Sequence, residues 1–327
     1  MDIDSPTYFR RTLLALFALA FANGAACAED RFPTRPIKIV VGSEAGSAPD
    51  VLARAVAQEM GPALGQSVII ENKPGAAGTI GATSVASAPP DGYTLLMGTV
   101  SNVSLAPSFY PVKYDPIKSF TPIGMVASVP LVLVTNPSMD VQTIAQLQAR
   151  AKQIGQFSYA SPGVGGPQHL AGVLLGRELG MQFLHVPYKS GGAAMTAVAA
   201  GDVQFAFAGI PAAAGLIKGK KATPILVTAS KRSSALPNVP SATEAGLPTF
   251  QIDNWHALLA PAHLSVPIRS ALEAALQKAL TIDSVKAQFM KAGAEPAPGT
   301  STQLEAFIAS ETQRWAKVVT DNKLKAE

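Results

Sequence analysis

Short runs of β-branched and other apolar residues alternate with longer alanine-rich stretches through most of the chain. The short runs predict strands, and the stretches between them, which repeat apolar residues every three or four positions, predict helices. The predicted strands are 37–41, 68–71, 94–97, 157–160, 183–186, 203–207 and 225–228. The predicted helices are 50–64, 79–86, 167–179, 193–200, 211–218, 267–281 and 301–319.

This alternation predicts an α/β protein, because strands separated by helices form parallel sheets with right-handed crossovers. The alternation is interrupted twice, at 123–136 and 250–261, where extended runs appear without an intervening helix. We interpret the two interruptions as places where the chain crosses between two lobes. Lobe one is then 29–134 plus 254–327, and lobe two is 135–253.

The N-terminal segment predicts export. Arg10 and Arg11 form a basic region, residues 12–22 form an apolar run, and Ala26-Cys27-Ala28 is a small-residue cleavage site. The apolar run is too short for a transmembrane helix, which needs about 20 apolar residues. We expect a signal peptide of residues 1–28, cleaved after about Ala28, and a periplasmic mature protein. The choice between Sec and Tat export, and lipidation at Cys27, stay open.

Composition narrows the classes of function. The chain is 48% hydrophobic and 15% charged, with a formal net charge of +4, which is typical of a compact α/β protein. The small positive surplus suits an anionic ligand, but no basic stripe interleaved with aromatic residues indicates nucleic-acid binding. The single cysteine, Cys27, leaves with the predicted signal peptide, so the mature chain has neither a disulfide nor a thiol nucleophile.

The patterns expected of an enzyme are not found. The sequence has no G-x-S-x-G, no H-E-x-x-H, no cysteine pair and no G-x-G-x-x-G after the first predicted strand. We therefore predict that the protein is not an enzyme and uses no metal or cofactor.

Glycine- and serine-rich turns lead from strands into the helices that follow at 41–50, 72–78 and 159–172. Such a junction presents free backbone N–H groups at the positive end of a helix dipole, where an anion can bind. We interpret Asp50, which opens a helix, as a first-turn residue rather than a ligand contact. Asn72 and Lys73 are interpreted as shaping the following Pro-Gly turn. Several anion-binding positions without catalytic groups predict that the protein captures an anion.

Eight stretches together resemble the Bug, or TctC-type, solute receptors of tripartite tricarboxylate transport systems. They run in family order over essentially the whole predicted mature chain, and the ordered set is far more specific than any one stretch. The stretches are 32–37 (FPTRPI), 70–81 (IENKPGAAGTIG), 90–95 (PDGYTL), 159–172 (YASPGVGGPQHLAG), 185–189 (HVPYK), 236–240 (LPNVP), 244–248 (EAGLP) and 293–296 (GAEP).

The resemblance implies a two-lobed type II periplasmic-binding-protein fold, the Venus flytrap, with two interlobe crossovers. It implies a receptor that captures a small carboxylate in the interlobe cleft and delivers it to membrane permease subunits of the tripartite type. We expect no nucleic-acid partner and a monomer. The alternative is a periplasmic ligand-sensing protein that docks on a signalling partner, since both uses need the same closing lobes.

The resemblance also implies ligand-binding residues, which lie on the predicted turns. These are Ser43, Gly46, Ser47, Thr99, Ser101, Asn102, Ser161, Gly163, Gly165, Gly166, His169, Tyr188 and Lys189.

Alternatives stay open at several positions near these turns. Lys189 is alternatively a rim lysine that only steers anions, and His169 a structural histidine that bonds loop backbone. Trp255 and His256, on the returning crossover, are interpreted as core or hinge residues rather than ligand contacts.

Overall fold

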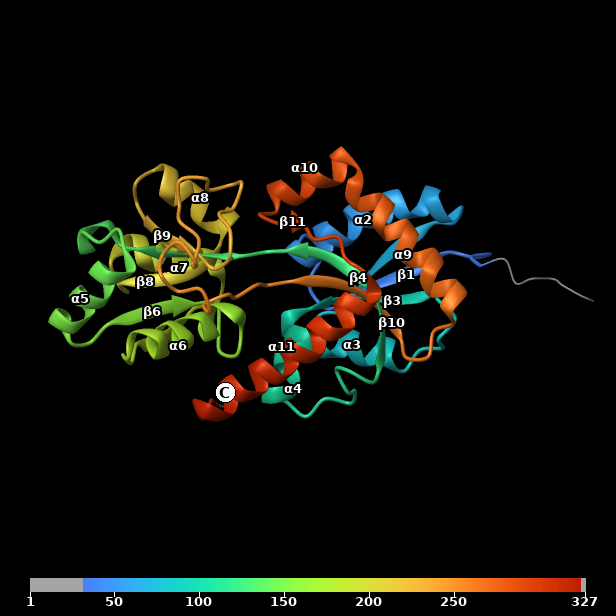
Figure 1. Ribbon diagram of the computed structural model, residues 1–327, viewed down its shortest axis with the longest axis horizontal. Coiled ribbons are helices and arrows are strands. Elements are labelled where there is room, and N and C mark those ends of the chain that lie inside the picture. The colour runs from blue at the N-terminus through green and yellow to red at the C-terminus, as the bar shows by residue number, and fades with distance from the viewer. Residues whose placement is uncertain (1–31, 325–327) are drawn as a thin grey trace, which may run out of the picture. The chain divides into compact units, whose positions relative to one another are not determined.

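The computed structural model describes residues 32–324, so the predicted signal peptide lies outside the described residues. The described chain forms two mixed β-sheets, each covered by helices (Figure 1). The strands are β1 (Ile37–Val41), β2 (Val68–Asn72), β3 (Thr94–Thr99), β4 (Phe120–Ser128), β5 (Leu131–Thr135), β6 (Ser158–Ser161), β7 (Leu184–Pro187), β8 (Phe205–Gly209), β9 (Thr223–Val227), β10 (His256–Pro261) and β11 (Glu295–Pro296).

The helices of the described residues include all those predicted from periodicity, together with three α-helices that were not predicted. The α-helices are α2 (Ala48–Leu64), α3 (Thr79–Ala86), α4 (Ala106–Phe109), α5 (Ile144–Ile154), α6 (Pro167–Leu179), α7 (Gly191–Ala200), α8 (Ile210–Lys218), α9 (Val266–Thr281), α10 (Asp283–Lys291) and α11 (Ser301–Asp321). Short turns of other helix types are η1 (Ala76–Gly78), η2 (Val100–Leu105) and η3 (Pro137–Met139). The three that were not predicted are the single-turn α4 and the longer α5 and α10.

The six-stranded sheet has the order β11-β4-β10-β3-β1-β2. Strands β1, β2 and β3 are parallel, as the alternation predicts. Strands β10, β4 and β11 are antiparallel to their neighbours, so the prediction of a parallel sheet is wrong for this half. The reason is that the chain leaves this sheet through β4 and comes back into it through β10. The two strands therefore run in opposite directions and pair antiparallel.

The five-stranded sheet has the order β7-β6-β8-β5-β9. Strands β6, β7 and β8 are parallel, whereas β5 is antiparallel to both β8 and β9. Strands β8 and β9 therefore run in the same direction, as their connection through α8 predicts, but β5 is inserted between them.

Both sheets have helices on both faces (Figure 1). Helices α2, α9 and α10 pack together on one face of the six-stranded sheet, and α3, α4 and α11 cover the other. In the five-stranded sheet, α7 and α8 pack on one face and α6 on the other. We call the six-stranded sheet with its helices lobe one and the five-stranded sheet with its helices lobe two.

The chain passes between the sheets at two places that lie side by side (Figure 1). Residues 129–130 connect β4 with β5, and residues 252–255 lead back to β10. The two segments are bonded to each other, since the Asn254 N–H donates to the Val129 carbonyl at 3.1 Å and Pro130 forms an antiparallel bridge with Asp253. We therefore propose that lobe two begins at residue 130 or 131, a few residues before the predicted 134/135 boundary, because β5 pairs only within the second sheet.

Asp253 joins the two passages through its side chain. Its Oδ2 accepts a hydrogen bond from the Ser128 hydroxyl at 2.6 Å, and its Oδ1 accepts one from the Val129 N–H at 2.7 Å. Burial raises the pKa of Asp253 to about 6, and the two hydrogen bonds, which favour the carboxylate, oppose this only in part. The carboxylates of Glu311 and Glu295 raise this pKa further.

Replacing this carboxyl group with an amide should change how stability depends on pH. The pKa of Asp253 is higher in the folded state than in the unfolded chain. Its contribution to the free energy of unfolding is therefore most favourable below pH 3.8 and is lost as pH rises through about 6. Asp253→Asn does not titrate, so it should gain about 1–2 kcal/mol relative to wild type between pH 4 and pH 7. Urea unfolding across that range measures the difference.

The matched control is Asp283→Asn, which removes a carboxylate whose side chain is 99% exposed. The control keeps Asp253, so it should show the same loss of stability between pH 4 and pH 7 that Asp253 causes in wild type. A stability difference between Asp253→Asn and wild type that does not vary with pH would contradict the raised pKa.

Candidate functional site

Three loops follow the carboxyl ends of the parallel strands β1, β2 and β3 and surround a cavity of about 390 Å³. This is the edge of a parallel sheet where ligands bind in α/β proteins. The returning crossover contributes Asn254. We call this space the loop cavity. Its lining residues are Gly42, Ser43, Glu44, Pro49, Pro74, Gly75, Ala77, Gly78, Thr99, Ser101, Asn102 and Asn254.

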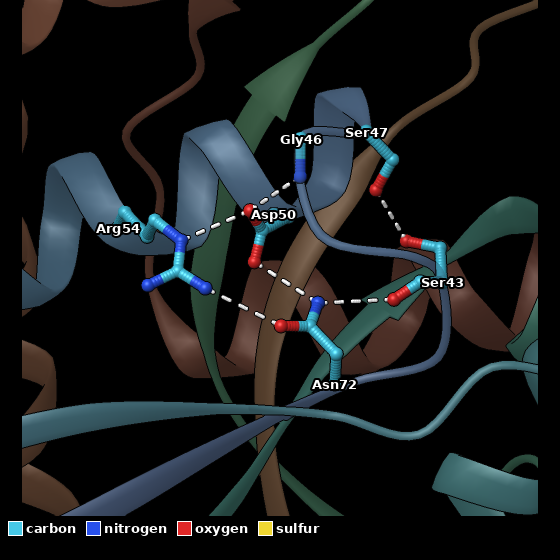
Figure 2. A network of polar contacts seen from close by, with 6 residues as sticks. All are labelled: Ser43, Gly46, Ser47, Asp50, Arg54 and Asn72. Atoms are coloured by element: carbon cyan, nitrogen blue, oxygen red, sulfur yellow. Dashed lines mark hydrogen bonds and ion pairs between the residues drawn. The ribbon is translucent and has the colours of Figure 1, made fainter.

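A buried carboxylate holds the first of these loops in place (Figure 2). Asp50, which is 2% exposed, accepts hydrogen bonds from the Gly46 N–H at 2.8 Å and from Arg54 Nε at 2.9 Å. Asn72 Nδ2 donates both to Asp50 Oδ1 and to the Ser43 carbonyl, each at 3.0 Å. The first-turn interpretation of Asp50 is confirmed, whereas Asn72 ties the end of β2 to the Ser43 loop.

The same contacts decide the protonation of Asp50 and the availability of Gly46. Burial alone would raise the pKa of Asp50, but hydrogen bonds from Arg54, Gly46 and Asn72 outweigh it and leave the pKa below its usual value. The Gly46 N–H, expected to face a ligand, is bonded to Asp50. The Ser43 and Ser47 hydroxyls bond to each other at 2.7 Å.

The second loop is a run of four residues with left-handed backbone. Gly75, Ala76, Ala77 and Gly78 have φ values of 118°, 47°, 54° and 85°. Such values are unfavourable for alanine, and consecutive ones are found where surrounding structure enforces them, often at functional sites. At Gly78 the loop approaches the first loop so closely that a Cβ on Gly42 would lie 2.8 Å from the Gly78 backbone.

The third loop begins with reciprocal bonds between Thr99 and Asn102. The Thr99 N–H donates to Asn102 Oδ1 at 2.7 Å, and the Asn102 N–H donates to Thr99 Oγ1 at 3.2 Å. Within residues 32–324, the side chains of Ser101 and Asn254 have no hydrogen-bond partner. Both line the loop cavity, so both are free to bond a ligand.

A second cavity, of about 600 Å³, lies between the lobes, and we call it the interlobe cavity. Asn254 lines it as well, and so do Gly46, Ala48 and Val51 from the loop and helix that follow β1. The two cavities are therefore neighbours. The remaining lining residues are Val129, Leu131, Pro162, Gln168, Gly191, Gly209, Pro211, Ala212, Gln288, Lys291 and Ala292.

In lobe two, Ser161 anchors the loop that follows β6. Ser161 is fully buried, and its hydroxyl donates to the Gly163 carbonyl at 2.8 Å and accepts from the Gly163 N–H at 3.2 Å. Its Oγ also lies 2.7 Å from His185 Nε2. Since the single hydroxyl proton goes to Gly163, His185 is the donor in that bond. Burial lowers the pKa of His185, which keeps its ring neutral near pH 7.

His169 holds the same loop one turn further on. Its Nδ1 accepts a hydrogen bond from the Gly165 N–H at 3.1 Å, and its ring lies 4.2 Å from that of His185. His169 is 6% exposed, and burial together with the neighbouring His185 lowers its pKa to about 4. These contacts favour the alternative in which His169 is a structural histidine.

The structure brings the predicted residues of lobe one together more closely than those of lobe two. Ser43, Thr99, Ser101 and Asn102 line the loop cavity, and Gly46 lines the interlobe cavity. The predicted residues that line neither cavity are Ser47, Ser161, Gly163, Gly165, Gly166, His169, Tyr188 and Lys189.

Asn254, which lines both cavities, is not among the residues predicted from the sequence. Asn254 precedes Trp255 and His256, which are fully buried, as the core interpretation of those two predicts. The one feature of the sequence that could have indicated Asn254 is its position in the extended run 250–261, which is interpreted as the returning crossover. Lobe two contributes Pro162 and Gln168, which lie next to predicted residues in the sequence, and Gly191, which lies two residues after the predicted Lys189.

Among residues 32–324, no group of three or more His, Cys, Asp or Glu side chains is placed to hold a metal ion. No helix in the same range has both the length and the apolar character needed to cross a bilayer.

Comparison with known proteins identifies the family. Residues 52–324 match the tripartite tricarboxylate transporter family receptor. The chain belongs to this receptor family. It is 33% identical over 313 residues to protein BugT of Bordetella pertussis, covering 94% of this chain and 95% of BugT.

Solved structures of similar proteins agree with this receptor family. The periplasmic binding protein BugD has a TM-score of 0.72 and 32% identity, covering 90% of this chain and 100% of that one. MatC from Rhodopseudomonas palustris, solved with bound malate, has a TM-score of 0.73 and 32% identity, with 88% and 100% coverage. The described lobes therefore form the two-lobed periplasmic-binding-protein fold, and the receptor family consists of solute-binding proteins rather than enzymes.

Removing the Asp50 carboxylate should destabilise this receptor. Asp50→Ala removes the acceptor of the Gly46 N–H and one of the two acceptors of the Asn72 amide, which should lower the free energy of unfolding by about 2–3 kcal/mol. The contribution is fully present above pH 3.8, the ordinary pKa, and is lost as pH falls below it. Urea unfolding at pH 7 measures the loss.

Arg54→Gln is the comparison, because the Arg54 side chain is 53% exposed and its ion pair is partly screened. It should cost less than Asp50→Ala. An equal cost for the two variants would mean that the ion pair, rather than the bonds to the loop, stabilises this region.

Replacing His169 should make the receptor more resistant to acid. The pKa of His169 is about 4 in the folded state and 6.5 unperturbed, so the contribution of the neutral ring is present above pH 6.5 and is lost as pH falls towards 4. His169→Asn offers an oxygen to the Gly165 N–H without titrating. As the pH falls from 7 to 4, the free energy of unfolding should decrease less in this variant than in wild type, by up to about 3 kcal/mol.

Thermal unfolding at each pH provides the measurement. His185 and His256 are present in both proteins, so the difference between the two proteins reports on residue 169. If the stability of His169→Asn falls with decreasing pH as steeply as that of wild type, protonation of His169 does not contribute to the loss of stability in acid.

Proposed function

We propose that this chain is an extracytoplasmic solute receptor that captures a small carboxylate and delivers it to membrane permease subunits of a tripartite tricarboxylate-type transporter. The observation that carries the proposal is the loop cavity, which opens at the carboxyl ends of β1, β2 and β3 and is lined by the unpaired side chains of Ser101 and Asn254.

The chemistry of this cavity suits a carboxylate head group. A hydroxyl and an amide can both donate hydrogen bonds to a carboxylate, and such charge-assisted bonds are stronger than neutral ones. Gly42, Gly75 and Gly78 let the backbone approach a ligand closely, because they carry no Cβ. The malate bound to MatC, which has the same fold, supports a carboxylate ligand for this chain.

The proposal includes the cellular setting and the motion of the receptor. Residues 1–28 are removed as a signal peptide after about Ala28, and the mature monomer acts in the periplasm. The paired crossovers at 129–130 and 252–255 are the hinge about which the lobes close on the ligand. The ligand contacts in lobe one are those of the loop cavity, and the lobe-two loop at 161–166 approaches the ligand on closure.

Ligand-dependent stabilisation tests the receptor function. The mature protein is unfolded and refolded to remove carried-over ligand, and its thermal unfolding is followed with di- and tricarboxylates, aromatic acids and their amides. A ligand at about 100 times its Kd adds about 2.7 kcal/mol of stability. We expect stabilisation by an acid and none by its amide.

Ser101→Ala should weaken binding of the stabilising acid about tenfold or more, because it removes a hydrogen bond to a charged group. The control is Ser310→Ala on α11, where the hydroxyl donates to the Phe307 carbonyl away from both cavities. Equal stabilisation by acid and amide would contradict the carboxylate function. Delivery is tested separately, by loss of uptake of that acid when the receptor is deleted.

A further inference from the structure

The interlobe cavity differs from the loop cavity in the chemistry of its walls. The loop cavity is lined mainly by glycines, hydroxyls and amides. The interlobe cavity, of about 600 Å³, has walls that are mainly apolar and come from both lobes and the first crossover. Its larger apolar side chains are Val51, Val129, Leu131, Pro162 and Pro211.

Charged groups are scarce around both spaces. Of the residues that line the interlobe cavity, Lys291 is the only charged one, and it is exposed at the end of α10. Of the residues that line the loop cavity, Glu44 is the only charged one. A second carboxylate on the ligand would therefore meet Glu44, the apolar walls or Lys291, and the attraction of Lys291 is screened by solvent because its side chain is exposed. Burying an ionised carboxylate without a partner is strongly unfavourable.

Resting on the proposed function, we infer that the ligand is a monocarboxylate with a compact apolar body, such as an aromatic ring on a short linker. The carboxylate binds Ser101 and Asn254 in the loop cavity, and the apolar body occupies the interlobe cavity. Asn254 lines both spaces, so the head group and the body can be joined by a short linker.

The volume and the position of the interlobe cavity support this ligand. A cavity of about 150 Å³ is enough for benzene in a protein interior, so this space accommodates a substituted ring. Val51 belongs to lobe one, whereas Pro211 and Ala212 belong to lobe two. An apolar body between them contacts both lobes and favours their closure. Each methylene that enters the cavity should raise the affinity about fourfold.

The experiment is isothermal titration of the refolded mature protein with two matched ligand series. One series is phenylacetate, 3-phenylpropionate and 4-phenylbutyrate, and the other is succinate, malate and adipate. The amide 3-phenylpropionamide completes the set. We expect the phenylalkanoates to bind at least tenfold more tightly than the dicarboxylates, and the amide to bind much more weakly than its acid.

Filling the interlobe cavity provides the matched variants. Ala212 and Ala214 are both exposed in α8, but only Ala212 lines the cavity. Ala212→Phe should weaken phenylalkanoate binding at least tenfold, whereas Ala214→Phe should leave it unchanged. Ala212→Gln, which places a polar group there without a bulky ring, is a second variant in case the first does not fold, and it should weaken the same ligands.

The outcomes separate the inference from the function on which it rests. Dicarboxylates that bind more tightly than phenylalkanoates, or phenylalkanoate binding that is unaffected by both Ala212 variants, would overturn the apolar ligand class and leave a carboxylate receptor. Equal binding of 3-phenylpropionate and its amide would overturn the carboxylate function itself, and the monocarboxylate ligand with it.

Discussion

The pairing of the two crossover segments is the constraint on which the rest of the structure depends. Because the chain leaves lobe one through β4 and returns through β10, its two passages run in opposite directions and bond to each other. Asp253 strengthens this pairing by binding Ser128 and Val129 from the other passage. The mixed character of both sheets and the common boundary of the two cavities follow from this arrangement.

The loops at the site show how stability and binding compete for the same polar groups. Backbone N–H groups that a ligand might use are bonded within the protein, those of Gly46 to Asp50 and of Gly165 to His169. These bonds give the loops defined conformations, since a buried donor without an acceptor is costly. In the proposed receptor, recognition would then depend on a few polar groups that remain unpaired, such as Ser101 and Asn254.

Periodicity located most elements because their buried faces repeat regularly, whereas α5 and α10 escaped notice. Helix α5 buries only Ile144, Leu147 and Ala151 among polar residues, and α10 buries only Val285 and Phe289. The insertion of β5 between β8 and β9 depends on partners far along the chain, which local patterns do not report. Turn chemistry indicated the first two loops of lobe one and the loop after β6, whereas Thr99, Ser101 and Asn102 were expected only from the family resemblance. Turn chemistry could not show that Ser161 and His169 are already engaged in hydrogen bonds within the protein.

The position of Asn254 has a mechanical consequence. In a rotation of two rigid bodies, points near the axis move least, and Asn254 lies in one of the two segments about which the lobes would turn. A ligand group bonded there keeps its contact throughout the motion, while walls further from the axis close around the rest of the molecule. In the proposed receptor, the ligand would first bind at Asn254 and the lobes would then close. The hydrogen bond made in the first step would not have to break for the second step to occur.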